Sequence, residues 1–334
     1  MLYSLSKSFF DGKEDLKNLN RVWYNSMDSH IFYQSDDDDI DSTIDSEWYK
    51  GLNDVDKKLY QDAVTNSIQM GSRSVNVIIG ETHTAFEANQ YLSQPLKIIL
   101  ENSENDAHFM NAIFRCFKSE SNKMLDKIAQ RVVVYDMGAG SCIEQKIQTE
   151  LNSFNGEGFP KKNHEYVRCF VVMDSDKKTP DDQLKPGALK IIKLLEANNI
   201  AYHILEKREM ENYLPDEVID DLAEQKQLVE AYLRMEPYQK DYFDMENGFA
   251  DINFDSLDDK AQSLYATLSE GDIKTFRKSG FKELFGKEEG SFKREFPKLF
   301  NSEKVTKLSL MAKTSHQSDS NELKTLVRKV RELL

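Results

Sequence analysis

The sequence predicts an α/β fold in which helices cover both faces of a central parallel sheet. Between residues 91 and 215, short apolar runs rich in β-branched residues alternate with stretches of helical periodicity. The apolar runs are continuous, as in strands buried on both faces, and alternation with helices is typical of parallel sheets. The flanking residues 1–90 and 216–334 are more polar and predict mainly helical extensions. A chain of 334 residues is long enough for two or three domains.

The N-terminal region, residues 1–90, is expected to be mixed and mainly helical. Apolar residues recur with a helical period at 54–70 and again at 84–92, which predicts two helices. A short apolar run at 74–79 predicts a strand between them. The acidic run at 36–45 has the composition of a calcium loop, but it lacks the turn glycine and closing glutamate of an EF-hand. We therefore expect a solvated acidic loop there.

Four strands and three helices are expected in the region 91–215. The strands are expected at 96–100, 131–135, 167–173 and 201–205, and the helices at 106–117, 141–151 and 184–198. A tight glycine turn at 137–140 follows the second strand, and Ser141 is the expected N-cap of the next helix. The region 216–334 is expected to be helical, with a polar break at 236–255 and a basic tail.

The charge of the chain excludes two classes of protein. The chain has 44 Lys and Arg against 58 Asp and Glu, a net charge of −14. A uniformly basic nucleic-acid coat and a polybasic membrane binder are therefore excluded. The acidity is uneven, because residues 271–334 hold 15 basic and 9 acidic residues. This basic tail is either an ordinary solvated helical face or a surface that faces an anionic partner.

The sequence also predicts where the protein works. No apolar run approaches the roughly 18 residues of a membrane span, and the N-terminal residues have no signal-peptide pattern. The three cysteines, Cys116, Cys142 and Cys169, are far apart and form no CxxC pair. A disulfide framework or a structural zinc site is therefore not expected. We expect a cytoplasmic protein.

Acidic residues follow three of the four predicted strands. Glu101 ends the first strand, Asp174 and Asp176 end the third, and the acidic stretch 206–213 follows the fourth. Because parallel strands end at one edge of a sheet, these carboxylates should meet, where they would repel one another or bind a cation. Strand side chains alternate, so both aspartates of the Asp-x-Asp should reach one ion. The pattern predicts an Mg²⁺ or Mn²⁺ site, and the alternative is a set of unrelated loop acids.

The order of these residues resembles a Toprim domain, the catalytic module of topoisomerases, primases and several nucleases. The resemblance lies in a strand ending at Glu101, a second ending in the glycine turn at Gly138, and a third ending at Asp174 and Asp176. The stretch REMENYLP at 208–215 is similar to one in Toprim nucleases of the overcoming-lysogenization-defect (OLD) type and in standalone Toprim effectors of bacterial anti-phage systems. The resemblance spans roughly residues 85–215.

The resemblance implies a Toprim-like fold and a metal-dependent endonuclease that uses two Mg²⁺ or Mn²⁺ ions. Glu101 would act as general acid/base or bridging ligand, and Asp174 and Asp176 would hold Mg²⁺. Glu211, or else Glu209, would complete a second metal site. A topoisomerase would need a larger chain, and a primase would need a zinc module.

One departure from the OLD-type pattern leaves three candidates for one of the metal ligands. That pattern places an aspartate four residues after the glutamate, but position 105 is asparagine here. Glu104, Asn105 and Asp106 are the alternatives, and we take Asp106 as the metal ligand. Asn102 also stands where family members often have glycine.

The expected partners are a nucleic acid, DNA or RNA, and a separate ATPase. Lys177, Lys178 and Arg208 lie beside the acidic clusters and are expected to hold phosphates. OLD-type nucleases often carry an ABC-type ATPase, but this chain contains no GxxxxGK[ST] motif. The resemblance therefore implies the effector of an anti-phage system that works with an ATPase in trans, and a homo-oligomer is compatible with it. The alternative is a catalytically silent Toprim-like binding or sensor subunit.

Overall fold

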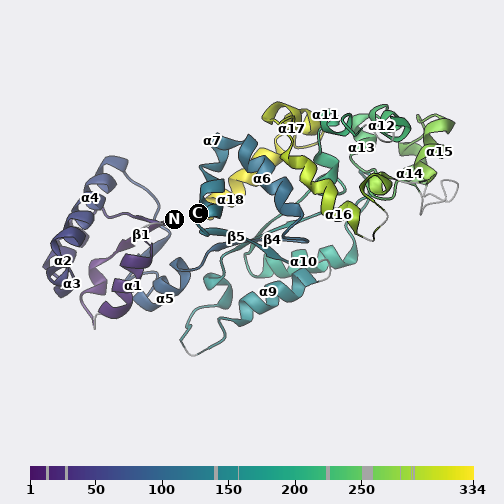
Figure 1. Ribbon diagram of the computed structural model, residues 1–334. Coiled ribbons are helices and arrows are strands. Elements are labelled where there is room, and N and C mark those ends of the chain that lie inside the picture. Colours follow the sequence, from purple (N-terminus) through teal and green to yellow (C-terminus); the bar gives the residue numbers. More distant parts are fainter. Residues whose placement is uncertain are drawn as a thin grey trace. The chain divides into compact units, whose positions relative to one another are not determined.

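The computed structural model is a mixed α/β protein with two parallel sheets (Figure 1). It describes residues 1–12, 15–26, 29–138, 142–156, 158–222, 226–249, 259–278, 280–286, 288 and 290–334. The chain forms two compact units. The first unit comprises Met1–Leu96, Glu150–Arg168 and Leu333–Leu334, and the second comprises Lys97–Thr149 and Cys169–Glu332. The sequence predicts three regions, whereas here most of the four-stranded sheet and the C-terminal helices belong to one unit.

The first unit is built on a three-stranded parallel sheet in the order β2-β1-β3. Its elements are β1 (Leu2–Leu5), η1 (Lys7–Phe9), α1 (Leu16–Ser26), β2 (Ile31–Phe32), α2 (Asp37–Asp45), α3 (Glu47–Gly51), α4 (Asp54–Met70), β3 (Val77–Ile79), α5 (Ala85–Leu92) and η3 (Asn163–Tyr166). The predicted helices at 54–70 and 84–92 and the strand within 74–79 are confirmed. Its core includes the buried Trp23, whose ring lies edge-on to those of Phe32 and Trp48.

The loop predicted at 36–45 is wrong, because this acidic run forms helix α2. The side chain of Asp36 is the N-cap and accepts a hydrogen bond from the N–H of Asp39. The acidic residues that follow occupy the first turn, where the positive end of the helix dipole favours negative charge. Lys7 adds an ion pair with Asp38 at 2.8 Å. The same aspartates that give this run the composition of a calcium loop therefore favour a helix start.

Gly80, which follows β3, is a position where only glycine fits. Its φ is +99°, and a Cβ there would lie 2.6 Å from the backbone nitrogen of Phe9. We expect Gly80→Ala to destabilise the protein by about 1–3 kcal/mol in urea denaturation, since backbone atoms must move. Gly51→Ala is the matched control, because nothing lies within 4 Å of a Cβ at that position. Equal stability of the two variants would contradict the interpretation that only glycine fits at position 80.

The sheet of the second unit has the order β5-β4-β6-β7, and β6 pairs in parallel with both β4 and β7. Its strands are β4 (Leu96–Leu100), β5 (Val133–Met137), β6 (Cys169–Met173) and β7 (Ala201–Ile204). All four predicted strands are confirmed, although β5 lies two residues later than expected. Arg131 has a φ of +60°, so the chain is still turning where the strand was predicted to begin. Every residue of β6 is buried, as its continuous apolar sequence predicts.

Helices surround this sheet and extend beyond it. They are α6 (Asp106–Cys116), α7 (Lys118–Ser121), α8 (Met124–Ala129), α9 (Ile143–Asn152), α10 (Pro186–Ala197), η4 (Met210–Tyr213), α11 (Asp216–Ile219), α12 (Lys226–Leu233), α13 (Pro237–Lys240), α14 (Asp259–Leu264), α15 (Glu270–Lys278), η7 (Phe281–Phe285), α16 (Ser291–Glu295), η8 (Phe296–Asn301), α17 (Lys307–Thr314) and α18 (Glu322–Glu332). Figure 1 shows α10 on one side of the sheet and α6 with α18 on the other. Ser141, the expected N-cap of α9, lies outside the described residues.

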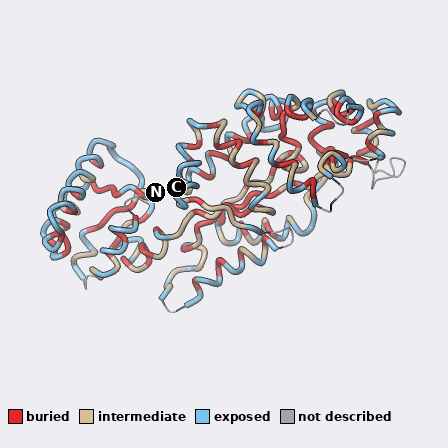
Figure 2. Tube along the Cα trace, in the orientation of Figure 1, coloured by how far each residue is buried: buried red, intermediate tan, exposed pale blue. Residues whose placement is uncertain are grey.

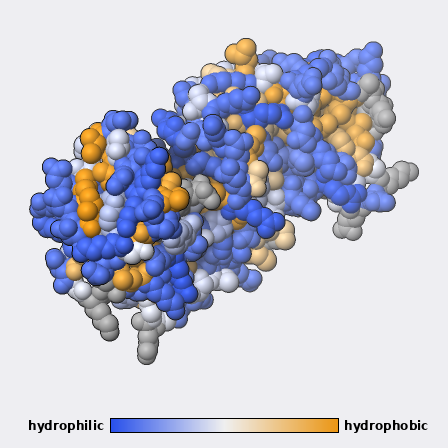
Figure 3. Space-filling view, turned by 60° about the vertical axis from the view of Figure 1, so that its left-hand side comes forward, coloured by the Kyte–Doolittle hydropathy of each residue, from blue (hydrophilic) through white to orange (hydrophobic). Residues whose placement is uncertain are grey.

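Burial follows these elements. Figure 2 shows buried residues gathered along the strands and on the inner sides of the helices. The face in Figure 3 is mostly hydrophilic, with separate apolar patches. Val55 on α4 and Leu308 on α17 are among the exposed apolar residues. No helix in the described ranges combines the length and the apolar character that a membrane span needs.

Candidate metal centre

An acidic cavity of about 290 Å³ opens where β4, β6 and β7 end. Because these strands are neighbours in the sheet, the residues that follow them lie at one edge. Eight carboxylates are among the residues that line the cavity, together with two basic side chains, three asparagines and one phenylalanine. The lining residues are Glu101, Asn102, Asn105, Asp106, Asp174, Asp176, Arg208, Glu209, Glu211, Asp244, Glu246, Asn247, Phe292 and Lys293.

All five predicted metal ligands line this one cavity: Glu101, Asp106, Asp174, Asp176 and Glu211. They come from three segments that are far apart in the sequence. The structure therefore brings together Glu101, Asp174, Asp176 and the acidic stretch after β7, as their positions at the strand ends predict, and it adds Asp106, which is named through the resemblance.

The geometry reduces the number of candidates for the second metal ligand after Glu101. Asn105 and Asp106 both line the cavity, and Glu104 is not among its described lining residues. Asp106 is the first residue of α6, and its Oδ2 accepts a hydrogen bond from the N–H of Asn102 at 2.8 Å. The segment between β4 and α6 thus turns the aspartate back toward the end of the strand.

Asp174 and Asp176 reach the cavity by a turn. The prediction that they do so through the alternation of side chains along a strand is therefore wrong. β6 ends at Met173, and Asp176 has a φ of +55°. The N–H of Asp176 donates to the Arg208 carbonyl at 2.9 Å. Oδ1 of Asp174 accepts from the N–H of Met210 at 3.1 Å. The Asp-x-Asp is therefore held by the segment that follows β7.

Gly138 brings the end of β5 beside the end of β4. Its N–H donates to the carbonyl of Leu100 at 2.8 Å, next to Glu101. A Cβ at this position would lie 2.6 Å from Ile143 and 3.1 Å from Ile99, so glycine permits the close approach. The rest of the predicted turn, residues 139–140, lies outside the described residues.

Burial and mutual repulsion raise the pKa values of five of the cavity carboxylates. Burial, followed by the charge of Glu211, raises the pKa of Asp174 well above its usual range. Burial also raises the pKa of Glu209 to about 8, of Glu211 to about 7 and of Asp106 to about 6. The pKa of Glu101 rises for the same reason, with Asp176 as the next cause. At neutral pH the cluster therefore holds protons or favours a bound cation.

Three basic side chains reduce this repulsion. Arg208 contacts Oε1 of Glu209 at 3.1 Å and Oδ2 of Asp244 at 2.7 Å. Lys185 Nζ lies 2.8 Å from Oδ2 of Asp176. Lys293 opposes the rise in the pKa of several cavity carboxylates.

Of the residues predicted to hold nucleic acid, only Arg208 lines the cavity. Lys177 and Lys178 are not among the described lining residues. The N–H of Lys177 donates to Ser175 Oγ at 3.3 Å, and that of Lys178 donates to Asp182 Oδ2 at 2.9 Å. These two lysines therefore belong to the turn that leads away from the Asp-x-Asp.

Sequence reasoning missed the residues that reach the cavity from the C-terminal part of the chain. Asp244, Glu246 and Asn247 follow α13, inside the stretch interpreted only as a polar break. Their acidic cluster in the sequence is a signal that could have been used. Phe292 and Lys293 lie on α16, and nothing in their local sequence indicates that this helix reaches the strand ends.

The donor set fits a hard divalent cation in its chemistry. Carboxylate and amide oxygens are the ligands that Mg²⁺ and Mn²⁺ prefer. Among the described residues, however, no three Asp, Glu, His or Cys side chains stand together in an arrangement that would hold one ion. Asp176 is paired with Lys185, and Asp174 accepts from the backbone. A cation at this place would compete with Lys185 for the carboxylate of Asp176.

Comparisons with known proteins assign no family. No family model matches the chain, no curated protein matches its sequence, and no solved structure matches its fold.

Proposed function

We propose that the chain is a metal-dependent nuclease that hydrolyses phosphodiester bonds at the acidic cavity. The observation that carries the proposal is that Glu101, Asp106, Asp174, Asp176 and Glu211 line one cavity at the carboxyl edge of a parallel sheet. The resemblance of these residues to a Toprim site of the OLD type supports the same activity. We place this activity in the cytoplasm.

The cavity residues would divide the chemical work by their environment. Asp174, Asp176, Asp106 and Glu211 would hold Mg²⁺ or Mn²⁺. When bound, two such ions would supply water activation and stabilisation of the leaving oxygen. Burial raises the pKa of Glu101, which makes its protonated form more accessible, as the role of a general acid/base requires.

The basic groups at the cavity are suited to a phosphate backbone. Arg208 and Lys293 line it, and Lys185 contacts Asp176. A net-acidic protein can bind a polyanion at such a place, because bound cations reverse the local charge. The proposed substrate is therefore a nucleic acid, and DNA and RNA are tested separately.

The test is a cleavage assay with supercoiled plasmid and, separately, total tRNA. Each is incubated with Mg²⁺, Mn²⁺ or EDTA. We expect metal-dependent cutting, and we expect Glu101→Gln to reduce its rate by more than about 100-fold. Removing a residue that only supports a metal ligand already reduces activity by up to about 100-fold, so the loss of Glu101 itself should be larger. Glu104→Gln is the matched control, because Glu104 is a neighbouring acid outside the lining residues. Cutting that persists in EDTA, or that survives Glu101→Gln, would contradict the proposal.

A catalytically silent binding or sensor subunit is the second candidate. It is favoured by the lack of a three-donor group among the described residues and by Asn102 and Asn105 in the lining. Mn²⁺ titration separates the two candidates. A protein that neither binds Mn²⁺ nor cuts nucleic acid would favour the silent subunit.

The ATPase partner and the role in anti-phage defence rest on the resemblance alone. We propose that an ABC-type ATPase acts in trans on this chain as part of a defence system. Purification of the chain from its native cells, followed by identification of the bound proteins, is the direct test. Recovery of the chain without any ATPase would contradict this partner.

A further inference from the structure

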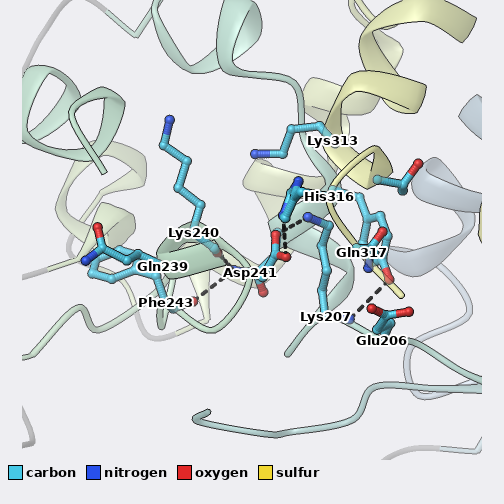
Figure 4. Close-up of polar contacts among 12 residues, drawn as sticks. Glu206, Lys207, Gln239, Lys240, Asp241, Phe243, Lys313, His316 and Gln317 are labelled. Carbon is cyan, nitrogen blue, oxygen red and sulfur yellow. Dashed lines mark hydrogen bonds and ion pairs between the residues drawn. The ribbon is translucent and has the colours of Figure 1, made fainter. Parts of the chain in front are cut away.

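A group of largely buried charges is joined to segments that line the acidic cavity. The side chain of Lys207 is fully buried, and its Nζ pairs with Oδ1 of Asp241. Nε2 of His316 lies 2.7 Å from Oδ2 of the same carboxylate. Figure 4 shows the lysine and the histidine meeting at Asp241. Both oxygens of one buried carboxylate are therefore held by two different segments of the chain.

Two of these residues are joined to residues that line the cavity. Lys207 directly precedes Arg208, whose N–H donates to the carbonyl of Asp241 at 2.9 Å. The side chain of Arg208 contacts Asp244, three residues beyond Asp241. The side chain of Asn212 joins the same two segments, because its amide donates to the carbonyls of Lys240 and Phe243 at 2.8 and 2.9 Å. Any shift of Asp241 would therefore move two cavity-lining segments together.

The connection between α17 and α18, together with the first residue of α18, contacts the segment after β7 through a second set of hydrogen bonds. Glu322, the buried first residue of α18, accepts from the N–H of Glu206 at 2.7 Å and from the hydroxyl of Tyr213. The carboxylate of Glu206 accepts from the N–H and hydroxyl of Ser318 at 2.7 and 2.8 Å. The segment after β7, which carries Glu209 and Glu211, is thus hydrogen-bonded to this connection at several points.

Stability alone is a weak reason to bury these charges. A buried ion pair often contributes no more than apolar side chains of the same size, whereas losing one member is costly. Such groups are useful where they fix one arrangement of a functional site. Residues that support metal ligands in this way typically change metal affinity or activity by about 10- to 100-fold when they are removed.

We propose that His316 and Asp241 are positioning residues for the acidic cavity. They hold the segment after β7 and the segment after α13 in the arrangement that lets their carboxylates share a metal ion. The C-terminal connection at 315–321 thereby sets the metal affinity of a site that it does not line. This inference rests on the proposed function, since it takes the cavity to be a metal site.

The test replaces His316, which is partly exposed and can be removed without opening the core. We expect His316→Ala to lose about 10-fold or more in Mn²⁺ affinity in a titration. His316→Gln should recover most of it, since its amide can still donate to Asp241. Thr325→Ala is the matched control, because Thr325 donates to Asp319 in the same connection, at 3.2 Å, without reaching Asp241. Hydrogen exchange of the metal-free proteins at 206–213 and 241–247 is the second readout, with faster exchange expected only in His316→Ala.

Each outcome decides the inference. Wild-type Mn²⁺ affinity in His316→Ala overturns it, as does an equal loss in His316→Gln or Thr325→Ala, which would indicate general destabilisation. If the wild-type protein binds no Mn²⁺, the proposed function fails. Hydrogen exchange then decides the positioning role by itself: unchanged exchange at 206–213 in His316→Ala overturns it, and faster exchange confined to that variant supports it.

Discussion

The Asp174→Asn protein is expected to lose metal-dependent cleavage and yet to be more stable than the wild type when no metal is present. Burial, and then the charges of Glu211, Glu101 and Asp106, raise the pKa of Asp174 well above its usual range. Folding must therefore either bury this charge or protonate the carboxylate, and asparagine, which has nearly the same shape, avoids both costs in the metal-free protein. It also removes a ligand from the proposed metal site. We expect a cleavage loss of more than about 100-fold together with a higher melting temperature in EDTA.

The opposite signs of these two effects make the prediction specific. A residue that only supports the fold would lose stability and activity together. Asp181→Asn is the control, since Asp181 is an exposed aspartate that is not among the cavity-lining residues. It should change neither cleavage nor melting temperature. An Asp174→Asn protein that melts lower in EDTA and still cuts would show that Asp174 is a structural residue.

The parts of this fold that could be predicted from the sequence are those with a local signal. The strand at 96–100 and the helix at 54–70 have the predicted bounds. Each carries its own pattern, a continuous apolar run in one case and a helical period in the other. Glu101, Asp174 and Glu211 could be placed at one cavity because parallel strands end at one edge of a sheet, whatever the details of the loops.

The parts that could not be predicted depend on contacts between distant segments or on competing local effects. β2 has only two residues, too few for a pattern, and exists because it pairs with β1. Lys293 reaches the cavity only because α16 packs near the strand ends. The sequence predicts a solvated acidic loop at 36–45, whereas the favourable place of aspartates in a first helical turn produces helix α2.

Raising the pH is expected to destabilise the metal-free protein between about pH 5 and pH 8. In the folded state the pKa values of Glu209, Glu211 and Asp106 are raised to about 8, 7 and 6, all above those of the unfolded chain. The folded protein therefore binds more protons than the unfolded chain in this window, so the free energy of unfolding falls as the pH rises. Each unit of difference in pKa corresponds to roughly 1.4 kcal/mol. Urea denaturation in EDTA across this range measures the loss.

Above about pH 8 the sign should change, because Lys207 contributes in the opposite sense. Burial lowers the pKa of Lys207 to about 8, below that of the unfolded chain. The unfolded chain then binds more protons, and stability recovers in part between about pH 8 and pH 10, the pKa of an unfolded lysine. Mg²⁺ should remove most of the loss between pH 5 and 8, because metal binding requires the ionised carboxylates. Its stabilising effect should therefore be larger at pH 8 than at pH 6. Glu211→Gln should flatten both trends, and a Mg²⁺ effect independent of pH would mean that these carboxylates are not the ligands.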